Sequence, residues 1–218
     1  MSVIHKTTMT PTKLELLEAW LPTRPWYVAT GAAPRLERAG GFRLDDPAGE
    51  VGIEFMVVRD LSGAGASGVR GYLVPMTYRA APLAGAEAGL VGTSEHGVLG
   101  TRHVYDGAHD PVLVDRLAAL LQGRAEPQAQ RVSHTPDPTV SAVLEGDGDW
   151  AAEGSGSVED GPEGTLVVLG PGAPALRLNR VLGAGDEPAG ARGAVTAPWR
   201  PAEDEERRDA FVVVLDGR

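Results

Sequence analysis

Hydrophobic residues recur every three to four positions near the start of the chain. This spacing predicts an amphipathic helix over residues 12–21. Thr12 and Glu15 stand in the order of a capping box, in which each side chain binds the other residue's backbone N–H at the start of a helix. Pro22 follows and would end the helix, because proline cannot continue the α-helical hydrogen bonding.

A second helix has clear start and stop signals. Asp110 is a favourable N-cap, Pro111 suits the first helical position, and Gly123 suits the left-handed residue that follows many helices. The residues between them form a wide apolar face. We therefore expect this helix to be largely buried.

Between the two helices the pattern changes to short apolar runs, which are typical of β-strands. The candidate strands are residues 41–44, 51–59, 71–79 and 97–105. Residues 60–70 are rich in Gly, Ala and Ser, so we expect them to join the second and third runs as a hairpin. Pro75 interrupts the third run and predicts an edge strand or a bulge.

After residue 123 the chain becomes polar and then β-rich. Residues 124–138 are polar and contain proline, and the β-like runs that follow are 139–144, 165–169, 175–182, 194–199 and 211–215. Residues 146–164 are expected to form a flexible loop, and the charged run 203–208 a solvated turn between two strands. We predict an α+β domain over 1–125 and a β-rich, mostly antiparallel part over 126–218.

Composition excludes several classes of protein. The 218 residues carry a formal net charge of −10, which disfavours binding to nucleic acid or to an anionic membrane surface. The chain has no cysteine, so a disulfide framework, a thiolate zinc site and a thiol nucleophile are excluded. No apolar run approaches the roughly 18 residues of a membrane span, and the start lacks the apolar segment of a signal peptide. We therefore expect a cytoplasmic protein.

Two short motifs suggest chemistry that their context does not support. Residues 63–68 match the glycine pattern of dinucleotide-binding loops, but that motif needs a helix directly after it, and a strand is predicted here. A flexible hairpin loop is the favoured interpretation. Residues 92–96 resemble a nucleophile elbow, but His96 occupies the position where the sharp turn needs glycine.

Histidine and carboxylate residues gather around the strand predicted at 97–105. They are Glu95, His96, His103, Asp106, His109 and Asp110. A metal site needs side chains that converge, such as two histidines four residues apart on a helix, whereas the histidines here are seven and six residues apart. The favoured interpretation is a set of polar and turn residues, and we predict no metal and no cofactor.

Phosphoryl transfer would need residues that the sequence lacks. A P-loop places lysine after glycine, and neither Lys6 nor Lys13 follows a glycine. The catalytic loop of protein-kinase-like enzymes needs an aspartate and, five residues later, an asparagine that holds metal. Asn179 is the sole asparagine, and Pro174 stands five residues before it. We therefore predict no catalytic residue.

Several segments of residues 1–125 form a specific combination. They are VIHKTT (3–8), GIEF (52–55), VPMTYR with the following PL (74–79 and 82–83), EHGVLG (95–100), and VYDGAHDP (104–111) leading into the helix that ends at 121. In this combination, residues 1–125 resemble the N-terminal cap domain of actinobacterial maltokinase and the related glucosamine kinase. The resemblance implies a curved antiparallel sheet with two helices. Residues 175–182 are similar to a strand of the kinases' intermediate lobe, with Arg177 in place of an expected lysine.

In those kinases the catalytic residues lie outside the cap, so the resemblance implies a stand-alone, non-catalytic relative. Our leading hypothesis is a binding or regulatory partner in the metabolism of maltose, trehalose, glycogen or glucosamine. Its partner would be a protein, such as a kinase without a cap of its own, or a second copy of the chain.

Two other functions remain open at this point. The first is a small-molecule module that binds a sugar or sugar phosphate beside residues 97–106. The candidate residues for ligand or partner binding are Glu95, His96, Arg102, His103, Tyr105 and Asp106. The second is an enzyme, either a degenerate sugar phosphotransferase or a glucan-branching enzyme. The latter needs a large barrel with paired carboxylates, for which the chain has neither the length nor a βα repeat.

Overall fold

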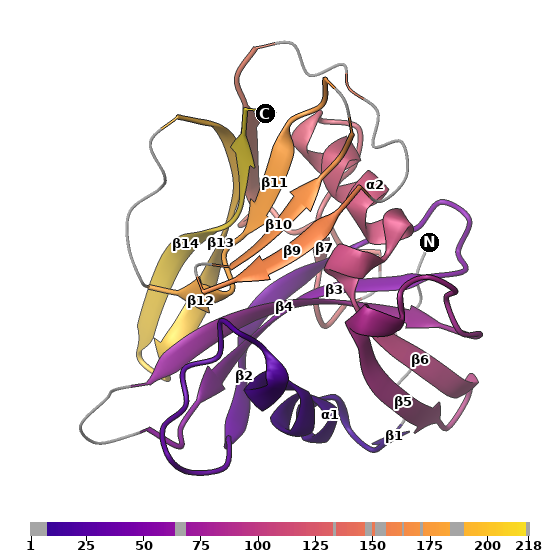
Figure 1. Cartoon of the computed structure of the whole chain (residues 1–218), viewed down its shortest axis with the longest axis vertical. Coiled ribbons are helices and arrows are strands. Elements are labelled where there is room, and N and C mark those ends of the chain that lie inside the picture. Colours follow the sequence, from indigo (N-terminus) through magenta and orange to yellow (C-terminus); the bar gives the residue numbers. More distant parts are fainter. Residues whose placement is uncertain are drawn as a thin grey trace.

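The computed structural model describes residues 8–63, 69–132, 134–146, 150, 156–162, 164–170, 172–183 and 190–216. These residues form a mostly β structure, in which two α-helices pack on one antiparallel sheet of 14 strands that is not closed (Figure 1). The predicted antiparallel sheet with two helices and a β-rich second part is confirmed.

The helices are α1 (Lys13–Trp20) and α2 (Pro111–Leu121), with short 3-10 helices η1 (Leu21–Thr23), η2 (Glu87–Gly89) and η3 (Gly107–His109). The strands of the first part are β1 (Met9–Thr10), β2 (Leu36–Leu44), β3 (Gly52–Asp60), β4 (Arg70–Arg79), β5 (Leu90–His96) and β6 (Gly100–Asp106). Those of the second part are β7 (Gln128–Ala129), β8 (Ser141–Leu144), β9 (Val158–Gly161), β10 (Gly164–Val168), β11 (Ala175–Leu178), β12 (Val181–Leu182), β13 (Ala191–Ala202) and β14 (Glu205–Leu215).

The strands follow one path across the sheet. Their order is β1-β5-β6-β4-β3-β2-β13-β14-β11-β10-β9, while β12 pairs with β4, β7 with β2, and β8 with β13. The sheet therefore crosses the boundary predicted between residues 125 and 126, and β2 meets β13 at Gly40 and Trp199. The division of the chain into two domains stays a prediction.

Both helices begin and end as their capping residues predict. The Thr12 hydroxyl accepts the backbone N–H of Glu15 at 3.3 Å, and the Glu15 carboxylate accepts that of Thr12 at 2.7 Å, which completes the capping box. Asp110 caps α2 through the N–H two residues later, and Gly123 has a φ of +69° just after the helix. Local hydrogen bonding thus explains both helix starts.

Strand β3 is buried on both faces, which explains the wholly apolar run at residues 55–58. Ile53, Phe55 and Val57 belong to the core cluster under α2, whereas Met56 and Val58 belong to the cluster under α1. Successive side chains of a strand point to opposite faces, so each face receives every second residue. The two helices accordingly lie on opposite sides of β2, β3 and β4 (Figure 1).

The two parts of the chain share the core under α2. The rings of Phe42 and Phe55 stack with centroids 4.5 Å apart, and Phe42 also stacks on Phe211 of β14 at 6.2 Å. All three side chains are fully buried. Aromatic stacking therefore connects strands of the predicted first domain to a strand of the second part.

The run 97–105 is a turn followed by β6 rather than the single strand predicted, and together with β5 it forms a hairpin. Strand β5 ends at His96, β6 begins at Gly100, and residues 97–99 form the turn between them. Val98 and Leu99 have the apolar character of strand residues, and this hid the turn. Gly100, with a φ of +69°, supplies the left-handed position that the turn requires.

Three other boundaries differ from prediction. Residues 146–164, expected as a loop, contain β9; residues 147–149, 151–155 and 163 of that range lie outside the described residues. The run 175–182 breaks at Asn179 and Arg180 into β11 and β12. Strand β2 begins at Leu36 instead of residue 41. The charged run 203–208 contains the predicted turn, at residues 203–204 between β13 and β14.

The predicted hairpin of β3 and β4 is confirmed, although residues 64–68 of its loop lie outside the described residues. Pro75 lies inside β4 rather than in an edge strand or a bulge. On the side of β4 away from β3, β12 covers residues 71–72 and β6 covers residues 76–79, so Pro75 falls between the two partner strands. A residue without an N–H fits there, because neither β12 nor β6 pairs with Pro75, whose register partner is Phe55 of β3 on the other side.

Substitution of Gly41 tests the geometry of β2. A Cβ at Gly41 would lie 1.9 Å from the carbonyl oxygen of Phe55, and φ is +124°. Gly49 also has a positive φ, +72°, but open space around it. We expect Gly49→Ala to cost about 1 kcal/mol of unfolding free energy from backbone strain alone, and Gly41→Ala about 3 kcal/mol or more from strain plus overlap. Urea unfolding measures both, and equal losses would contradict the close approach at β2.

Candidate functional site

The turn between β5 and β6 is held in place by His96. The ring Nδ1 of His96 accepts the backbone N–H groups of Val98 at 3.3 Å and Leu99 at 3.1 Å. These two bonds satisfy donors at the turn that no strand partner reaches. The imidazole therefore orders the turn, and we call residues 95–102 the hairpin tip.

Polar residues on both strands brace the hairpin tip. Arg102 donates to the carbonyl oxygen of Leu99 at 2.6 Å, and the Thr101 hydroxyl donates to Glu95 at 2.6 Å. The N–H of Gly97 binds the carbonyl oxygen of Thr8, which ties the tip to the segment before β1. The conformation of the turn is thus fixed by side-chain and backbone hydrogen bonds.

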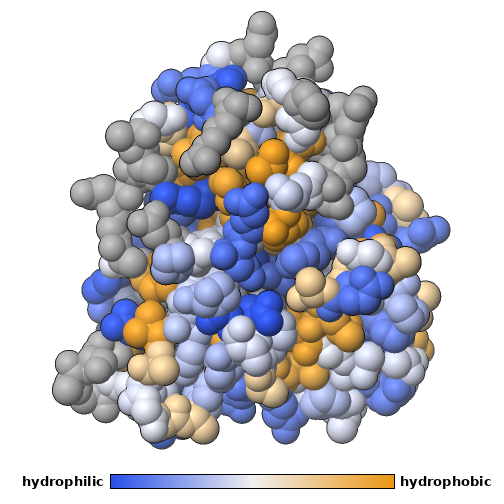
Figure 2. Space-filling view, viewed as in Figure 1, coloured by the Kyte–Doolittle hydropathy of each residue, from blue (hydrophilic) through white to orange (hydrophobic). Residues whose placement is uncertain are grey.

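The ordered turn presents two aliphatic side chains to solvent. Val98 is 62% exposed and Leu99 is 44% exposed. Hydrophobic residues lie among hydrophilic ones over the lower right of Figure 2, where Figure 1 places β5 and β6. Exposed aliphatic residues on a braced turn form a small apolar surface with a polar rim, which is the composition of many protein contact sites.

The structure divides the six predicted binding residues into two groups. Glu95, His96, Arg102 and His103 lie on the hairpin and are partly or fully exposed. Tyr105 and Asp106 lie at the buried end of β6. The Tyr105 hydroxyl accepts the N–H of Leu83 at 2.8 Å, a contact within the fold. Ligand binding by these six residues stays a prediction, but only the first group faces solvent.

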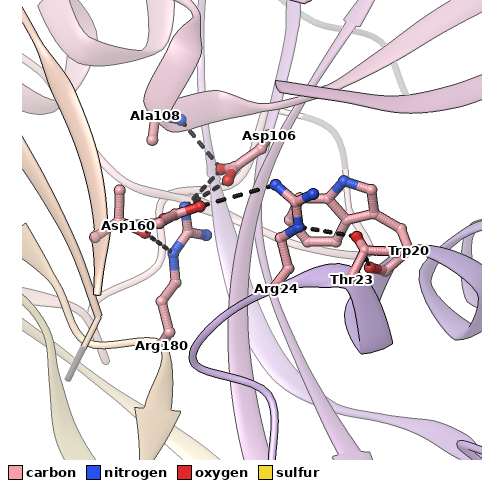
Figure 3. Close-up of polar contacts among 8 residues, drawn as sticks. Trp20, Thr23, Arg24, Asp106, Ala108, Asp160 and Arg180 are labelled. Carbon is pink, nitrogen blue, oxygen red and sulfur yellow. Dashed lines mark hydrogen bonds and ion pairs between the residues drawn. The ribbon is translucent and has the colours of Figure 1, made fainter. Parts of the chain in front are cut away.

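Asp106 forms a buried ion pair with Arg180, 74 residues later in the chain (Figure 3). The Arg180 Nη2 donates to the two carboxylate oxygens at 2.8 and 2.6 Å, and both side chains are fully buried. Asp106 also accepts the N–H of Ala108 at 3.2 Å. One carboxylate thus connects the end of β6, the start of η3 and the break between β11 and β12.

Further side chains complete this junction. Arg180 Nε donates to the Thr165 hydroxyl at 2.7 Å, and that hydroxyl donates to Asp160 at 2.5 Å. The Arg180 guanidinium also lies over the ring of Trp26, 5.1 Å from its centroid. Asp160 lies 3.8 Å from Arg24, which packs on another indole of the first part (Figure 3). Charged side chains of both parts therefore meet at one junction, which is fully buried at Asp106 and Arg180 and partly exposed at Arg24 and Asp160.

A second buried carboxylate, Glu54, lies on the α1 face of β3. Its oxygens accept from Lys13 of α1 at 2.5 Å and Tyr78 of β4 at 2.7 Å. They also accept from Gln130 at 3.0 Å and Arg38 of β2 at 3.3 Å. Glu54 is 3% exposed. Four donors from separate segments meet one anion, which offsets the cost of burying it.

Electrostatics keep Glu54 ionised. Burial alone raises the pKa of Glu54, but the charges of Lys13 and Arg38 and the hydrogen bonds from Lys13 and Tyr78 outweigh burial and lower the pKa from 4.5 to about 2. Burial and the neighbouring Glu54 charge raise the pKa of Tyr78 well above its usual value, so its hydroxyl stays a donor. Glu54 is therefore the anion of the cluster at neutral pH, and Lys13 and Arg38 are its counter-charges.

The remaining candidate motifs have contacts within the fold. Ser94, in the motif that resembled a nucleophile elbow, lies inside β5 and donates to the carbonyl oxygen of Pro11 at 2.7 Å. Across the described ranges, no three His, Asp or Glu side chains are placed to hold a metal ion. In the same residues, no helix combines the length and the apolar character needed to cross a membrane.

Comparison with known proteins identifies the first part of this fold. Residues 20–110 match the family model of the maltokinase N-terminal cap domain, so the chain contains a maltokinase N-terminal cap domain. The matched range runs from the last residue of α1 to the N-cap of α2 and covers less than half of the 218 residues. It confirms the resemblance seen in the sequence. No curated protein matches the chain.

Sequence reasoning missed four residues that organise these sites: Val98, Leu99, Glu54 and Arg180. Val98 and Leu99 lie between two glycines, a spacing that could have indicated a turn. Glu54 is the only charged residue in an apolar run, which could have indicated a buried partnered carboxylate. No local signal pairs Arg180 with a carboxylate 74 residues away.

The Glu54 cluster predicts a specific dependence of stability on pH. Because its folded pKa, about 2, lies below its ordinary value of 4.5, ionised Glu54 stabilises the fold fully above about pH 5, and this stabilisation is lost as pH falls towards 2. Between pH 5 and 2, wild type should lose about 3 kcal/mol more unfolding free energy than Glu54→Gln. Urea unfolding across this range is the measurement. The exposed control Glu50→Gln should show the same change of unfolding free energy with pH as wild type. The same pH dependence in wild type and Glu54→Gln would refute the ion cluster.

Proposed function

We propose that this protein is a non-catalytic binding partner in sugar metabolism, which docks through the hairpin tip of its maltokinase N-terminal cap domain. The observation that carries the proposal is the exposed Val98–Leu99 turn, held rigid by His96 inside the matched family range. A preformed turn loses little conformational entropy on binding, so its apolar area contributes more fully to affinity.

The sequence supports a non-catalytic role. Asn179 is the sole asparagine of the 218 residues, and its side-chain amide donates to the carbonyl oxygen of Ala210 at 2.8 Å and accepts from Arg177 at 3.1 Å. Lys13 is bound to Glu54. These side chains serve the fold, and Pro174 occupies the position where a kinase-type catalytic loop needs its aspartate.

The hairpin tip is a better contact surface than the edges of the sheet. Among the described residues, the strand path ends in β1, with 2 residues, and in β9, with 4 residues. Short edge strands offer few backbone groups to an added strand, and proteins use them to prevent unwanted pairing. A partner is therefore expected to bind the projecting side chains rather than to extend the sheet.

The occupant we propose is an enzyme of sugar metabolism, with a sugar kinase that lacks a cap of its own as the leading candidate. The family that matches residues 20–110 is named for a sugar kinase. Arg102 and Glu95 place charges of both signs beside the aliphatic pair, so the partner surface should be an apolar depression with a mixed polar rim.

Substitution of the exposed pair tests this function. Val98→Asp combined with Leu99→Asp should weaken the complex at least tenfold, since burying each aliphatic side chain is worth about 1.5–3 kcal/mol. Val143 is 58% exposed on β8, so Val143→Asp is a matched control that should bind like wild type. The partner is captured from native lysate, identified by mass spectrometry, purified, and titrated against all three proteins by calorimetry.

Two outcomes would contradict the proposal. One is equal affinity of the enzyme partner for wild type and for the Val98→Asp, Leu99→Asp double variant. The other is a wild type that retains no sugar-metabolism enzyme. Light scattering, which measures molar mass, adds a direct check. If wild type is a dimer and the double variant is a monomer, the hairpin tip serves self-association instead.

A further inference from the structure

A polar pocket of about 690 Å³ opens where the two parts of the chain meet. It is lined by β2 and β3 of the first part, by the β13–β14 hairpin, and by four residues between α2 and β8: Gln130, Arg131, Asp137 and Thr139. Its volume lies within the range of pockets that hold small organic ligands, roughly 300–1,000 Å³. None of its lining residues belongs to the hairpin tip, so it is a separate site.

Two glycines of β2 shape one wall of this pocket. The register of β2 against β3 shifts between Arg38 and Gly40, and Gly40 and Gly41 have φ values of +155° and +124°. A Cβ at Gly40 would lie 3.1 Å from the backbone of Trp199, so glycine lets β13 come close at this one point. Gly40 and Trp199 are the single register pair of β2 and β13. The bulge bends β2, so β2 and β13 separate on either side of the contact between Gly40 and Trp199. Bulges are common next to binding sites.

The pocket concentrates arginine in an acidic protein. Arg38, Arg59, Arg131 and Arg200 line it, while the chain as a whole carries a net charge of −10. Within the described part of the chain, Arg131 makes no ion pair and no hydrogen bond through its guanidinium. Arg200 pairs with Glu206 at 3.9 Å, and both side chains are more than 60% exposed. Such a surface pair is weak, so both guanidinium groups can bind an anion.

The deeper arginines are held in place by acids of the fold. Arg59 binds Glu37 at 2.7 Å, and Arg38 uses Nη2 to bind Glu54 at 3.3 Å, which leaves its other nitrogens for a ligand. A guanidinium positioned by a carboxylate presents its remaining donors in a fixed direction. Together, the four arginines of the pocket favour a tetrahedral, doubly charged oxyanion, because arginine binds phosphate oxygens with paired hydrogen bonds.

Acceptors share the pocket with the arginines. Asp137, Glu203, Glu206 and the side chains of Gln130 and Thr139 also line it. Carboxylates repel a second phosphate but accept hydrogen bonds from hydroxyl groups. A ligand with one phosphate and a hydroxylated body would satisfy both kinds of lining group.

The geometry points to a binding site for a small phosphorylated polyhydroxy compound between β2, the β13–β14 hairpin and the lining residues Arg131 and Asp137. The phosphate contacts Arg131, Arg200 and Arg38, and the hydroxyl groups contact Asp137 and its neighbours. Because the lining comes from both parts of the chain, the ligand also joins them. This site does not depend on the partner proposed for the hairpin tip.

Calorimetric titration with glucose 6-phosphate, inorganic phosphate and glucose tests the site. Glucose 6-phosphate carries both groups and should bind at least tenfold more tightly than either of the other two. Arg131→Gln combined with Arg200→Gln should lower that affinity about tenfold or more, because it removes charge-assisted hydrogen bonds. Arg35 is exposed and outside the pocket, so Arg35→Gln should bind like wild type.

Several results would overturn the assignment. They are no heat of binding with millimolar glucose 6-phosphate, equal affinity for glucose, equal affinity for inorganic phosphate, or unchanged affinity in the Arg131→Gln, Arg200→Gln variant. Thermal unfolding by circular dichroism checks that this variant folds, which its exposed side chains lead us to expect. The Val98→Asp, Leu99→Asp variant should retain ligand affinity, so failure of the hairpin contact and failure of this site are distinguishable.

Discussion

The fully buried ion pair of Asp106 and Arg180 is the constraint on which the rest of the structure depends. A buried charge without its partner costs several kcal/mol, so each residue is fixed where it can meet the other. Asp106 ends β6, and its carboxylate caps η3, which leads into α2. Arg180 separates β11 from β12, and its carbonyl oxygen accepts the N–H of Leu73 on β4. The pair therefore positions the second part of the chain against the cap domain.

The buried charges stabilise the fold, whereas the exposed surfaces are available for binding. Glu54 and Asp106 are saturated by donors from several elements and hold strands and helices together. Their polar atoms are occupied within the fold, so recognition falls to groups that reach solvent. The hairpin tip offers an apolar contact with a polar rim, and the pocket beside Gly40 offers guanidinium groups. A rigid frame supports both, which is the usual arrangement for binding loops.

The sequence predicted those features that depend on neighbouring residues. The helices were predictable because Thr12, Glu15 and Asp110 bind backbone groups within a few positions. The hairpin tip could not be predicted, because its aliphatic turn has the composition of a strand. The turn is ordered by the His96 imidazole, which no local pattern indicates. Arg180 could not be matched with Asp106, since pairing across 74 residues depends on the path of the whole sheet. The predicted binding residues all lie on the β5–β6 hairpin, and their role in binding stays a prediction; Tyr105 and Asp106 lie at its buried end, where they make contacts within the fold.

The central claim is that the ion pair couples the two parts of the chain, and a double-mutant cycle on the free energy of unfolding tests it most directly. Asp106→Asn and Arg180→Met each leave one charge or polar group buried without its partner, and each should cost about 3–5 kcal/mol. The account predicts that the double variant loses far less unfolding free energy than the two single variants lose together. The double variant should also be at least as stable as the less stable of the two single variants. Losses that simply add would contradict it.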